Sequence, residues 1–434
     1  MKKLVVLFLV VAAVVPLFAN GQGETAKGPS IPEIRFAYNW TGTATSKEVE
    51  FEGRLFQYQK DHAAEVKMVY ETAPDMTLQN KIKVDLAADD LPDVFLYWGG
   101  MSNVGDMIEY GRLLDVESFC KESSVLKKEY WPDSTFMDST VDGKAYMFPI
   151  STFKWFPIYN KALFDKFGLE IPTTYEELKK CAEVFKANDI VTIGVGSLGG
   201  EYGHVYYCQI LYQLAGGVAD TRDLNKDYQF ESPATLRAAE YVAEMKSLGM
   251  FPADTIAQGG SSQATALYTQ SKCAMILCAP WLLDTIDSDV LATSVIADFP
   301  RLPDATVDPA TFNQGSVSQG LCIAKESFED PAKKEQIIKF VDYILSDETF
   351  YILARTNDLP AKTVVVDESE LHPWIAKSIA ATNGQETYQP LWFLLPTTET
   401  STAYLDGIDE LFAGAVTPAT FVKNVQAAFD ASRP

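Results

Sequence analysis

One stretch in the middle of the chain, residues 141–169, constrains the fold more than any other: VDGKAYMFPISTFKWFPIYNKALFDKFGL. Asp142–Gly143 is a dipeptide typical of a β-hairpin turn. The apolar segment that follows carries two aromatic residues around a lysine, at Phe153–Trp155, and ends at Tyr159–Lys161. A helical pattern begins directly after it. The stretch therefore predicts a hairpin and then a buried strand that passes straight into a helix.

Strands and helices alternate on both sides of this stretch. The predicted strands lie at Ile34–Tyr38, Val66–Tyr70, Val94–Tyr97, Ile190–Val195 and Cys273–Cys278. The predicted helices lie at Lys47–Lys60, Met76–Ala88, Tyr206–Leu214 and Ala234–Ser247. Alternation of this kind predicts an α/β fold with mostly parallel sheets that helices cover on both faces. Such sheets bind ligands beyond the carboxyl ends of their strands.

Several helices are predicted to begin at a capping residue. Thr173 and Glu176 fit a capping box. Ser232, Asp330 and Thr417 each precede a proline, the pattern of an N-cap followed by proline at the first helical position.

The N-terminus has the pattern of an export signal. Met1–Lys3 is positively charged, Leu4–Phe18 is apolar, and Ala19–Gly21 offers a cleavage site after Ala19. We expect residues 1–19 to be a signal peptide and residues 20–30 a flexible leader, since an apolar run of this length is short for a membrane span. An uncleaved anchor is the alternative. The first cysteine is Cys120, so a lipid anchor is not expected.

The size and charge of the chain limit its fold and partners. About 400 mature residues exceed what one hydrophobic core supports, so we expect two lobes. The formal net charge of −23 argues against nucleic acids and anionic membranes, because both require basic patches. It also argues against a strongly anionic ligand, although a local pocket can override the overall field.

The cysteines and histidines do not suggest a metal site or a catalytic triad. The cysteines are Cys120, Cys181, Cys208, Cys273, Cys278 and Cys322. They form no CxxC pair and match no zinc spacing, and we expect buried free thiols rather than disulfides. His62, His204 and His372 are far apart in the sequence. We therefore expect neither a metal nor a cofactor, and no Ser-His-Asp triad.

Two motifs have a possible chemical interpretation. Gly194–Gly199 matches GxGxxG and Asp220 follows about 20 residues later, as in a dinucleotide site. A loop and not a helix follows the glycines, so a simple loop at a strand end is preferred. Asp223–Glu231 alternates acidic and amide residues like a calcium loop, but Tyr228 stands where an EF-hand requires glycine. A solvated turn is preferred there.

Tryptophans recur where predicted strands end. Trp40, Trp98, Trp155 and Trp281 all follow or interrupt a predicted strand. Flat aromatic faces together with a few amide and carboxyl groups suit sugar rings, whose CH faces stack on indole while their hydroxyls form hydrogen bonds. Glycosidase chemistry would require two carboxylates that face each other across a cleft, and nothing in the sequence marks such a pair.

Several blocks resemble the family 1 extracellular solute-binding proteins, the maltose-binding type that serves ATP-driven sugar importers. LAADDLPDVFLYW at Leu86–Trp98 is similar to the family's entry into its third strand. DGKAYMFP, YNKALFDKFGL and IPTTYEEL, all within Asp142–Leu178, are similar to its central block. KCAMILCAPW at Lys272–Trp281 and the C-terminal LFAGAVTPATFVKNVQAAF resemble two further blocks. The resemblance covers nearly the whole mature chain.

The resemblance implies a two-lobed, type II periplasmic binding protein fold in which the chain crosses between lobes three times. The crossings are expected near Ser151–Lys154, Asn313–Val317 and Phe350–Asn357. The N-terminal lobe would then comprise residues 31–151 and 316–350, and the C-terminal lobe residues 152–315 and 351–434. A solute, most simply a neutral mono- or oligosaccharide, would bind in the cleft, and hinge closure would present the receptor to an ABC permease.

The resemblance also places candidate ligand-binding residues at the cleft. They are Asn39, Trp40, Tyr97, Trp98, Phe153, Lys154, Trp155, Glu201, Tyr202 and Trp281, with Trp392 and Tyr404 as two candidates for a C-terminal aromatic. The protein is expected to be a periplasmic or extracellular monomer and not an enzyme. Two alternatives stay open: the same fold with a polyol, amino-acid-like or cationic solute, and an exported glycan-active enzyme.

Overall fold

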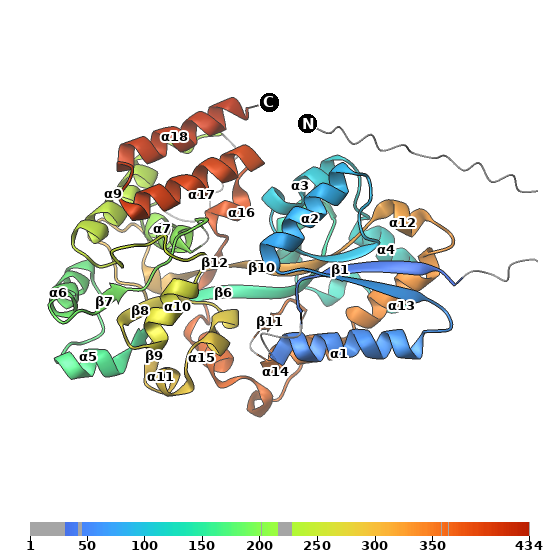
Figure 1. Cartoon of the computed structure of the whole chain (residues 1–434), viewed down its shortest axis with the longest axis horizontal. Helices are drawn as coiled ribbons and strands as arrows, with labels where there is room; N and C mark the ends of the chain where they lie inside the picture. The colour runs from blue at the N-terminus through green and yellow to red at the C-terminus, as the bar shows by residue number, and fades with distance from the viewer. Residues whose placement is uncertain are drawn as a thin grey trace, which may run out of the picture. The chain divides into compact units, whose positions relative to one another are not determined.

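Six strands of the main sheet are predicted ones, and the strand order shows how the chain connects two regions of the molecule (Figure 1). The computed structural model describes residues 31–433 except 42–45, 201, 216–227, 357 and 363. The predicted signal peptide, 1–19, and leader, 20–30, lie outside the described residues. Within the described part, the main sheet has ten strands with the central order β2-β1-β3-β10-β6-β8-β7.

The first three strands are parallel, as predicted. β1 (Glu33–Tyr38) lies between β2 (Lys67–Thr72) and β3 (Val94–Trp98) and pairs in parallel with both. The connecting helices are α1 (Ser46–Asp61) and α2 (Asp75–Ala87). α3 (Met101–Glu109), α4 (Val116–Glu122), the short turns η1 (Lys128–Tyr130) and η2 (Asp133–Ser139), and the hairpin strands β4 (Thr140–Val141) and β5 (Lys144–Ala145) follow. The hairpin turn is the predicted Asp142–Gly143, where both residues have positive φ.

Two long strands connect the halves of the sheet. β6 (Phe148–Asn160) and β10 (Phe312–Ile323) pair in antiparallel orientation from Leu321 opposite Phe148 to Gln314 opposite Trp155. β10 also pairs antiparallel with β3. The predicted parallel strands are thus present, but the strands that join them run in the opposite direction, and the sheet is mixed.

The second half of the sheet continues from β6. β8 (Cys273–Cys278) pairs antiparallel with β6 and parallel with β7 (Val191–Ile193). β9 (Ser294–Ile296) and β11 (Leu359–Pro360) pair with β6, and β12 (Glu386–Tyr388) pairs with β10. Its helices are α5 (Lys161–Phe167), α6 (Tyr175–Lys186), α7 (Gly203–Leu214), α9 (Pro233–Ser247), α10 (Ser262–Thr269), η3 (Pro280–Thr285), α11 (Ser288–Ala292) and η4 (Pro309–Thr311).

The last quarter of the chain consists mainly of helices. They are α12 (Lys325–Glu329), α13 (Lys334–Ile344), α14 (Asp347–Thr356), η5 (Glu368–Glu370), α15 (Pro373–Ala381), α16 (Leu391–Leu394), α17 (Thr398–Ala413) and α18 (Pro418–Ala431).

Buried apolar side chains gather in two regions, which we call the amino lobe and the carboxyl lobe. In the amino lobe the strand residues alternate between two clusters, one on each face of the sheet: Phe36 and Leu96 belong to one, Ala37 and Phe95 to the other. α1, α13 and α14 cover the first face, and α2 and α3 cover the second. One large cluster around β7, β8 and the far end of β6 forms the core of the carboxyl lobe.

The chain passes between these lobes on β6, on β10 and after β11. On β6 the core membership changes between Ile150 and Phe153. The third passage is later than expected: Leu353 and Ala361 still belong to the amino-lobe core, and Trp374 is in the carboxyl-lobe core. The stretch Phe350–Asn357 is largely helix α14, and Asn357 itself lies outside the described residues.

The helix caps follow the predicted chemistry with two differences. Ser232 and Thr417 cap α9 and α18 as predicted. The capping box of α6 is formed by Thr174 and Glu177, one residue later than predicted. Asp330 accepts a hydrogen bond from the N–H of Ala332 at 2.9 Å but α13 begins only at Lys334.

The six cysteines form no disulfide, and five of them are buried. Burial raises the pKa of Cys181 and Cys208 to about 11, which keeps these thiols protonated and unreactive near neutral pH. Within the described part of the chain, none of the helices combines the length and apolar character that a membrane crossing requires.

Candidate functional site

The residue pattern of β6 separates neighbouring side chains onto two faces of the sheet. Successive side chains of a strand point to opposite faces, so Phe153 and Trp155 share one face and Thr152 and Lys154 share the other. The burial pattern agrees: Phe153 and Trp155 are buried, and Thr152 and Lys154 are half-buried. The three consecutive candidates Phe153–Trp155 therefore do not line one site.

Aromatic rings from several elements meet on the Phe153 face. We call this group the aromatic cluster: Phe153, Trp155, Tyr202, Trp281, Trp392 and Phe393. Ring centroids are 5.6 Å apart for Phe153 and Trp281, and 5.4 Å apart for Trp155 and Trp281. Tyr202 lies 5.6 Å from Trp155, which places the residue before α7 against the connecting strand. These rings come from β6, the end of β8 and the start of α7, so the predicted strand-end aromatics of the carboxyl lobe do converge.

The amino lobe contacts the aromatic cluster through a glycine. Phe393, on α16, lies 5.9 Å from Phe153 between ring centroids. Gly100 follows β3 with φ +101°, and a Cβ at this position would lie 2.6 Å from Cδ1 of Phe393. Only glycine tolerates both this backbone angle and this close approach. α3 and α16 consequently pack against each other between the lobes, as Figure 1 shows.

The carboxyl end of the amino-lobe sheet also presents polar groups. Gln319 on β10 donates a hydrogen bond from Nε2 to Oδ1 of half-buried Asn39 at 2.6 Å. Asp138 is buried and accepts hydrogen bonds from the N–H of Val317 at 3.1 Å and from the hydroxyl of Ser316. An amide and a carboxylate thus lie on β10 and next to it, at the edge of the sheet where parallel strands present ligands.

Two predicted residues of the amino lobe lie in the core. Trp40 is 2% exposed and packs edge-on against Phe51, with the ammonium of Lys47 4.6 Å from its ring centroid. Tyr97 is fully buried, and its hydroxyl donates to the carbonyl of Gln79 at 3.4 Å. Neither ring has a contact with the aromatic cluster. Their place in the amino-lobe core is the common role of large aromatics.

Trp98 and two members of the aromatic cluster, Trp281 and Trp392, are more exposed than the other rings of the cluster. Trp98, Trp281 and Trp392 are half-buried, whereas Phe153, Trp155, Tyr202 and Phe393 are 1–8% exposed. Trp392 donates from Nε1 to Oγ of Ser401 at 2.7 Å, which fixes its ring. The half-buried rings are thus the more accessible ones, and the buried rings pack behind them.

Of the two C-terminal aromatic candidates, the structure brings only Trp392 to the cluster. Its ring centroid lies 5.4 Å from that of Phe393. Tyr404, on α17, is fully buried and packs against Tyr207, Phe230 and Phe421 in the core of the carboxyl lobe. Sequence reasoning could not choose between them because both are aromatic residues that precede the last helix of the chain.

The glycine motif is a loop held by a carboxylate. Asp409 on α17 accepts hydrogen bonds from the N–H of Gly199 at 2.7 Å, from the N–H of Gly200 at 2.8 Å and from Oγ of Ser197 at 2.9 Å. A dinucleotide site would need such N–H groups for phosphate. The loop interpretation is therefore confirmed. Predicted Glu201 lies outside the described residues, as do Asp220 of the possible dinucleotide motif and residues 223–227 of the possible calcium loop.

His204 adds a neutral ring beside the cluster. It is buried in the first turn of α7, 5.8 Å from Trp392 between ring centroids, and its Nδ1 has no hydrogen-bond partner. Burial lowers the pKa of His204 to about 3, so the imidazole is uncharged at neutral pH. His204 thus adds no charge to this end of the cluster.

Lys154 points to the opposite face of β6. Its Nζ donates to Oγ1 of Thr382, after α15, at 3.2 Å. A cavity of about 290 Å³ on this face is lined by Lys154, and a second cavity of about 240 Å³ is lined by residues 155–157 and by Asn313 and Thr382. Lys154 is therefore separated from Phe153 and Trp155 by the sheet itself.

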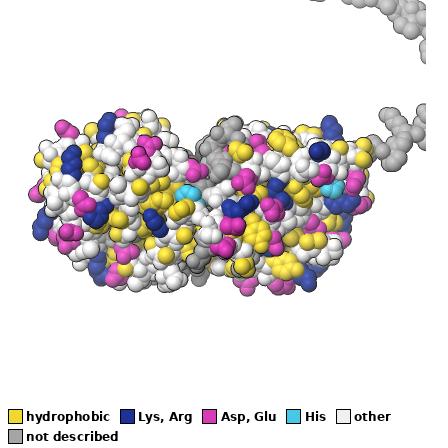
Figure 2. Space-filling model, turned by 90° about the horizontal axis from the view of Figure 1, so that it is seen from below, with side chains coloured by type: hydrophobic (Ala, Val, Ile, Leu, Met, Phe, Trp, Pro, Cys, Tyr) yellow, Lys and Arg dark blue, Asp and Glu magenta, His cyan; other side chains and the backbone are white. Residues whose placement is uncertain are grey.

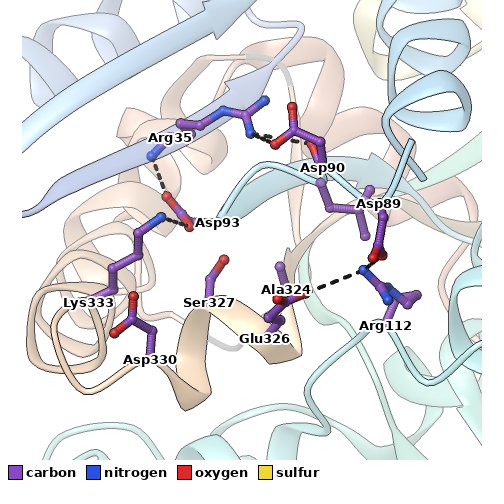
Figure 3. A pocket seen from close by; sticks show the side chains of 11 residues that line it. Arg35, Asp89, Asp90, Asp93, Arg112, Ala324, Glu326, Ser327, Asp330 and Lys333 are labelled. Carbon is purple, nitrogen blue, oxygen red and sulfur yellow. Dashed lines mark hydrogen bonds and ion pairs between the residues drawn. The ribbon is translucent and has the colours of Figure 1, made fainter. Parts of the chain in front are cut away.

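A charged cavity of about 410 Å³ lies at the amino ends of β1 and β3 (Figure 3). Ion pairs join Arg35 to Asp90, Lys333 to Asp93, and Arg112 to both Asp89 and Glu326. Because these charges neutralise one another across the cavity, its walls brace β1 and the loop before β3 against α12 and α13. Within the described residues, no group of His, Cys, Asp and Glu is arranged to hold a metal ion.

Sequence reasoning missed three residues that shape the site: Phe393, Gly100 and Asp138. The adjacent aromatics Trp392 and Phe393 were a usable signal for the first of them. Gly99–Gly100 directly after a strand is a signal for close backbone approach. Asp138 lies in a short helical turn before the hairpin, and nothing in its neighbourhood of the sequence marks it.

The sequence matches a known protein family. Residues 55–383 match the family described as "Bacterial extracellular solute-binding protein". The galactooligosaccharide-binding protein of Bacillus subtilis (strain 168) is 24% identical over 391 residues, which cover 88% of this chain and 84% of that protein.

Two solved structures extend the comparison over the fold. A chitin oligosaccharide binding protein has a TM-score of 0.79 at 19% identity and covers 91% of this chain and 98% of its own. A maltose-bound protein of T. maritima has a TM-score of 0.71 at 17% identity, with coverage of 92% and 99%. The match confirms the expected two-lobed type II fold.

Proposed function

This chain belongs to the bacterial extracellular solute-binding proteins, and from that premise we propose that it captures a neutral carbohydrate for an ATP-driven importer. The sugar binds between the lobes, against the half-buried tryptophans Trp98, Trp281 and Trp392. Closure of the lobes around it creates the form that the membrane permease recognises. The protein acts as a monomer outside the cytoplasm, without a lipid anchor, and does not alter its ligand.

The observation that carries this proposal is the aromatic cluster with its accessible tryptophans. Indole faces stack on the CH faces of sugar rings, and each such contact contributes free energy beyond the area it buries. The buried rings Phe153 and Trp155 fix the position of Trp281. Asn39 and Gln319 supply amide groups on the amino lobe that can bond to hydroxyls. Relatives named for galactooligosaccharides and chitin oligosaccharides support the same ligand class.

A neutral ligand fits the charges around the cluster. His204 is uncharged and Lys154 lies on the other face of the sheet. The buried carboxylate of Asp138 is already bonded to Ser316 and Val317. Neither His204 nor Lys154 therefore places a positive charge at the aromatic cluster, and stacking and neutral hydrogen bonds dominate recognition.

A thermal-shift panel on the mature protein, from Asn20 onward, tests the proposal. Sugars, polyols, amino acids and polyamines are compared at equal concentration. A ligand that binds only the folded state stabilises it by about 2.7 kcal/mol at a hundredfold excess over Kd. We expect a sugar to give the largest shift. A shift with only amino acids or polyamines would reject the carbohydrate, and turnover of a chromogenic glycoside would reject a pure binding role.

A further inference from the structure

A cavity of about 290 Å³ on the Lys154 face of β6 lies apart from the aromatic cluster. Three segments form its wall: β6, the stretch around β11, and the end of α15. The lining residues are Thr152, Lys154, Leu359, Pro360, Lys362, Val364, Ser378, Ile379 and Thr382. β6 passes between the lobes here, Val364 packs against the amino-lobe core and α15 belongs to the carboxyl lobe, so the cavity lies at the junction between the lobes.

The charge of this wall is opposite to the charge of the chain. The sequence has 59 acidic residues and only 36 lysines and arginines. The lining residues nevertheless include two lysines and no aspartate or glutamate. On the face shown in Figure 2, acidic and basic side chains are interspersed, as is usual for a soluble surface. A hollow with only cationic groups is therefore a local exception that suits an anion.

Lys154 has no counter-ion. Its Nζ donates to the hydroxyl of Thr382 at 3.2 Å, and among the described residues it forms no ion pair. The residue is half-buried, and desolvation lowers the pKa of its ammonium. An ammonium that is partly removed from water without a paired charge is unfavourable, and an anion at this place would relieve the cost.

Lys362, the second lysine that lines the cavity, is fixed by an ion pair and by aromatic rings. Only 8% of the residue is exposed, and its Nζ lies 2.6 Å from Oδ1 of Asp347. The same ammonium lies 5.4 Å from the ring centroids of Tyr130, Trp131 and Phe350. These contacts fix the position of a second cation, although Asp347 already offsets part of its charge.

The rest of the wall is mostly apolar. Leu359, Pro360, Val364 and Ile379 contribute aliphatic surface. The hydroxyls of Ser378 and Thr382 donate within the chain, to the carbonyls of Ile375 and Ser378, both at 2.9 Å. The unused donors of the cavity are therefore those of the ammonium groups. A ligand with one anionic group and a short aliphatic chain matches this combination, whereas an inorganic anion would leave the aliphatic surface unused.

We propose that this cavity binds a small aliphatic monocarboxylate, with its carboxylate on Lys154 and its chain against Leu359 and Ile379. Because the wall includes both lobes, occupancy changes the free energy of lobe movement and hence the affinity for the transported solute. This consequence rests on the proposed function, but binding of the carboxylate does not.

Calorimetric titration of the mature protein with sodium butyrate tests the proposal. Butanol, butylamine and sodium chloride serve as probes that each lack one part of the ligand. We expect saturable binding of butyrate alone. Lys154→Met should weaken it about tenfold or more, because a charge-assisted hydrogen bond is lost, and Lys154→Arg should retain it.

A second pair of variants keeps the test independent of Lys154. Ile379→Glu adds a carboxylate to the wall and should abolish butyrate binding, whereas Ile379→Gln, of equal size, should bind more tightly than Ile379→Glu. No saturable binding to the wild type, unchanged binding to Lys154→Met, or equal binding of chloride or butanol would overturn the proposal. A failed sugar panel together with butyrate binding would reject the transport ligand and leave this site intact.

Discussion

The two faces of β6 differ although their residues alternate along one strand. On one face Phe153 and Trp155 are buried among the rings of Tyr202, Trp281 and Phe393. On the other face Lys154 lines a cavity and donates a hydrogen bond to the hydroxyl of Thr382. The first face is filled and uncharged, and the second is hollow and cationic.

This difference shows how a connecting strand can serve two sites. A strand that runs between lobes presents both of its faces at the junction, and different elements pack on the two faces of β6. Side-chain alternation then assigns neighbouring residues to separate environments. Substitutions at adjacent positions of β6 should therefore have different effects: loss of packing on the face of Trp155 and loss of a charge on the face of Lys154.

The largest effect is expected for Trp155→Ala on the filled face. The side chain is 8% exposed and contacts Tyr202 and Trp281, so its removal leaves a cavity. We expect the free energy of unfolding to fall by about 3–5 kcal/mol. Urea unfolding followed by circular dichroism measures it. A loss below about 1 kcal/mol would mean that this face is not the packed one.

The second-largest effect on stability is expected from acidification, through the buried His204 beside the aromatic cluster. The folded-state pKa of His204 is about 3, below the unfolded value of about 6.5. The unfolded chain therefore binds a proton that the folded chain does not, and stability falls as the pH drops below 6.5. Between pH 6.5 and 5 this amounts to about 2 kcal/mol. His204→Phe should remove that part of the slope in unfolding curves recorded across this range, and parallel curves for the two proteins would contradict the neutral, buried imidazole.

Trp281→Ala should distinguish a residue that contacts the sugar from one that stabilises the fold. Trp281 is half-buried, so we expect a smaller loss of stability than for Trp155→Ala. Affinity for the sugar identified by the panel should fall by about 1 kcal/mol or more, because a stacking surface is lost. Calorimetry measures the affinity, and Tyr110→Ala, which changes an exposed aromatic residue of α3's C-terminal end, is the matched control. Equal affinities for Trp281→Ala and the control would exclude Trp281 as a platform.

The smallest effect on stability is expected for Lys154→Met. Methionine keeps the length of the side chain and removes a poorly compensated charge, so the free energy of unfolding should change by less than about 0.5 kcal/mol or increase. The same urea titration measures it beside Trp155→Ala. A loss as large as that of the tryptophan variant would show that the two faces are equally packed.

Much of the fold could be predicted because local patterns determine it. The run Cys273–Cys278 is apolar throughout and bounded by polar and proline residues, and it forms β8 over those same residues. The N-cap of α6 was predicted one residue too early, because the sequence TTYEE at 173–177 allows a capping box to begin at either Thr173 or Thr174. Tyr175 decides between them: it is 2% exposed and must enter the core, so the helix starts after Thr174.

The site was harder to predict because it depends on contacts between distant residues. Phe393 reaches the cluster only because Gly100, nearly 300 residues earlier, has no side chain. The third passage between the lobes was expected within α14. The amphipathic pattern of this helix indicates that one of its faces is buried, but it does not indicate which lobe that face packs against. The position of Lys154, by contrast, could have been inferred, since a period of two along β6 places it opposite Phe153 and Trp155.

A crystal structure of the mature protein with the sugar that gives the largest thermal shift would decide between these two faces. We predict sugar density stacked on Trp281, within reach of Trp98 or Trp392, with the lobes closed around it. Sugar density in the cavity beside Lys154, or away from all three tryptophans, would contradict the proposed site and require the carbohydrate to be recognised without the aromatic cluster.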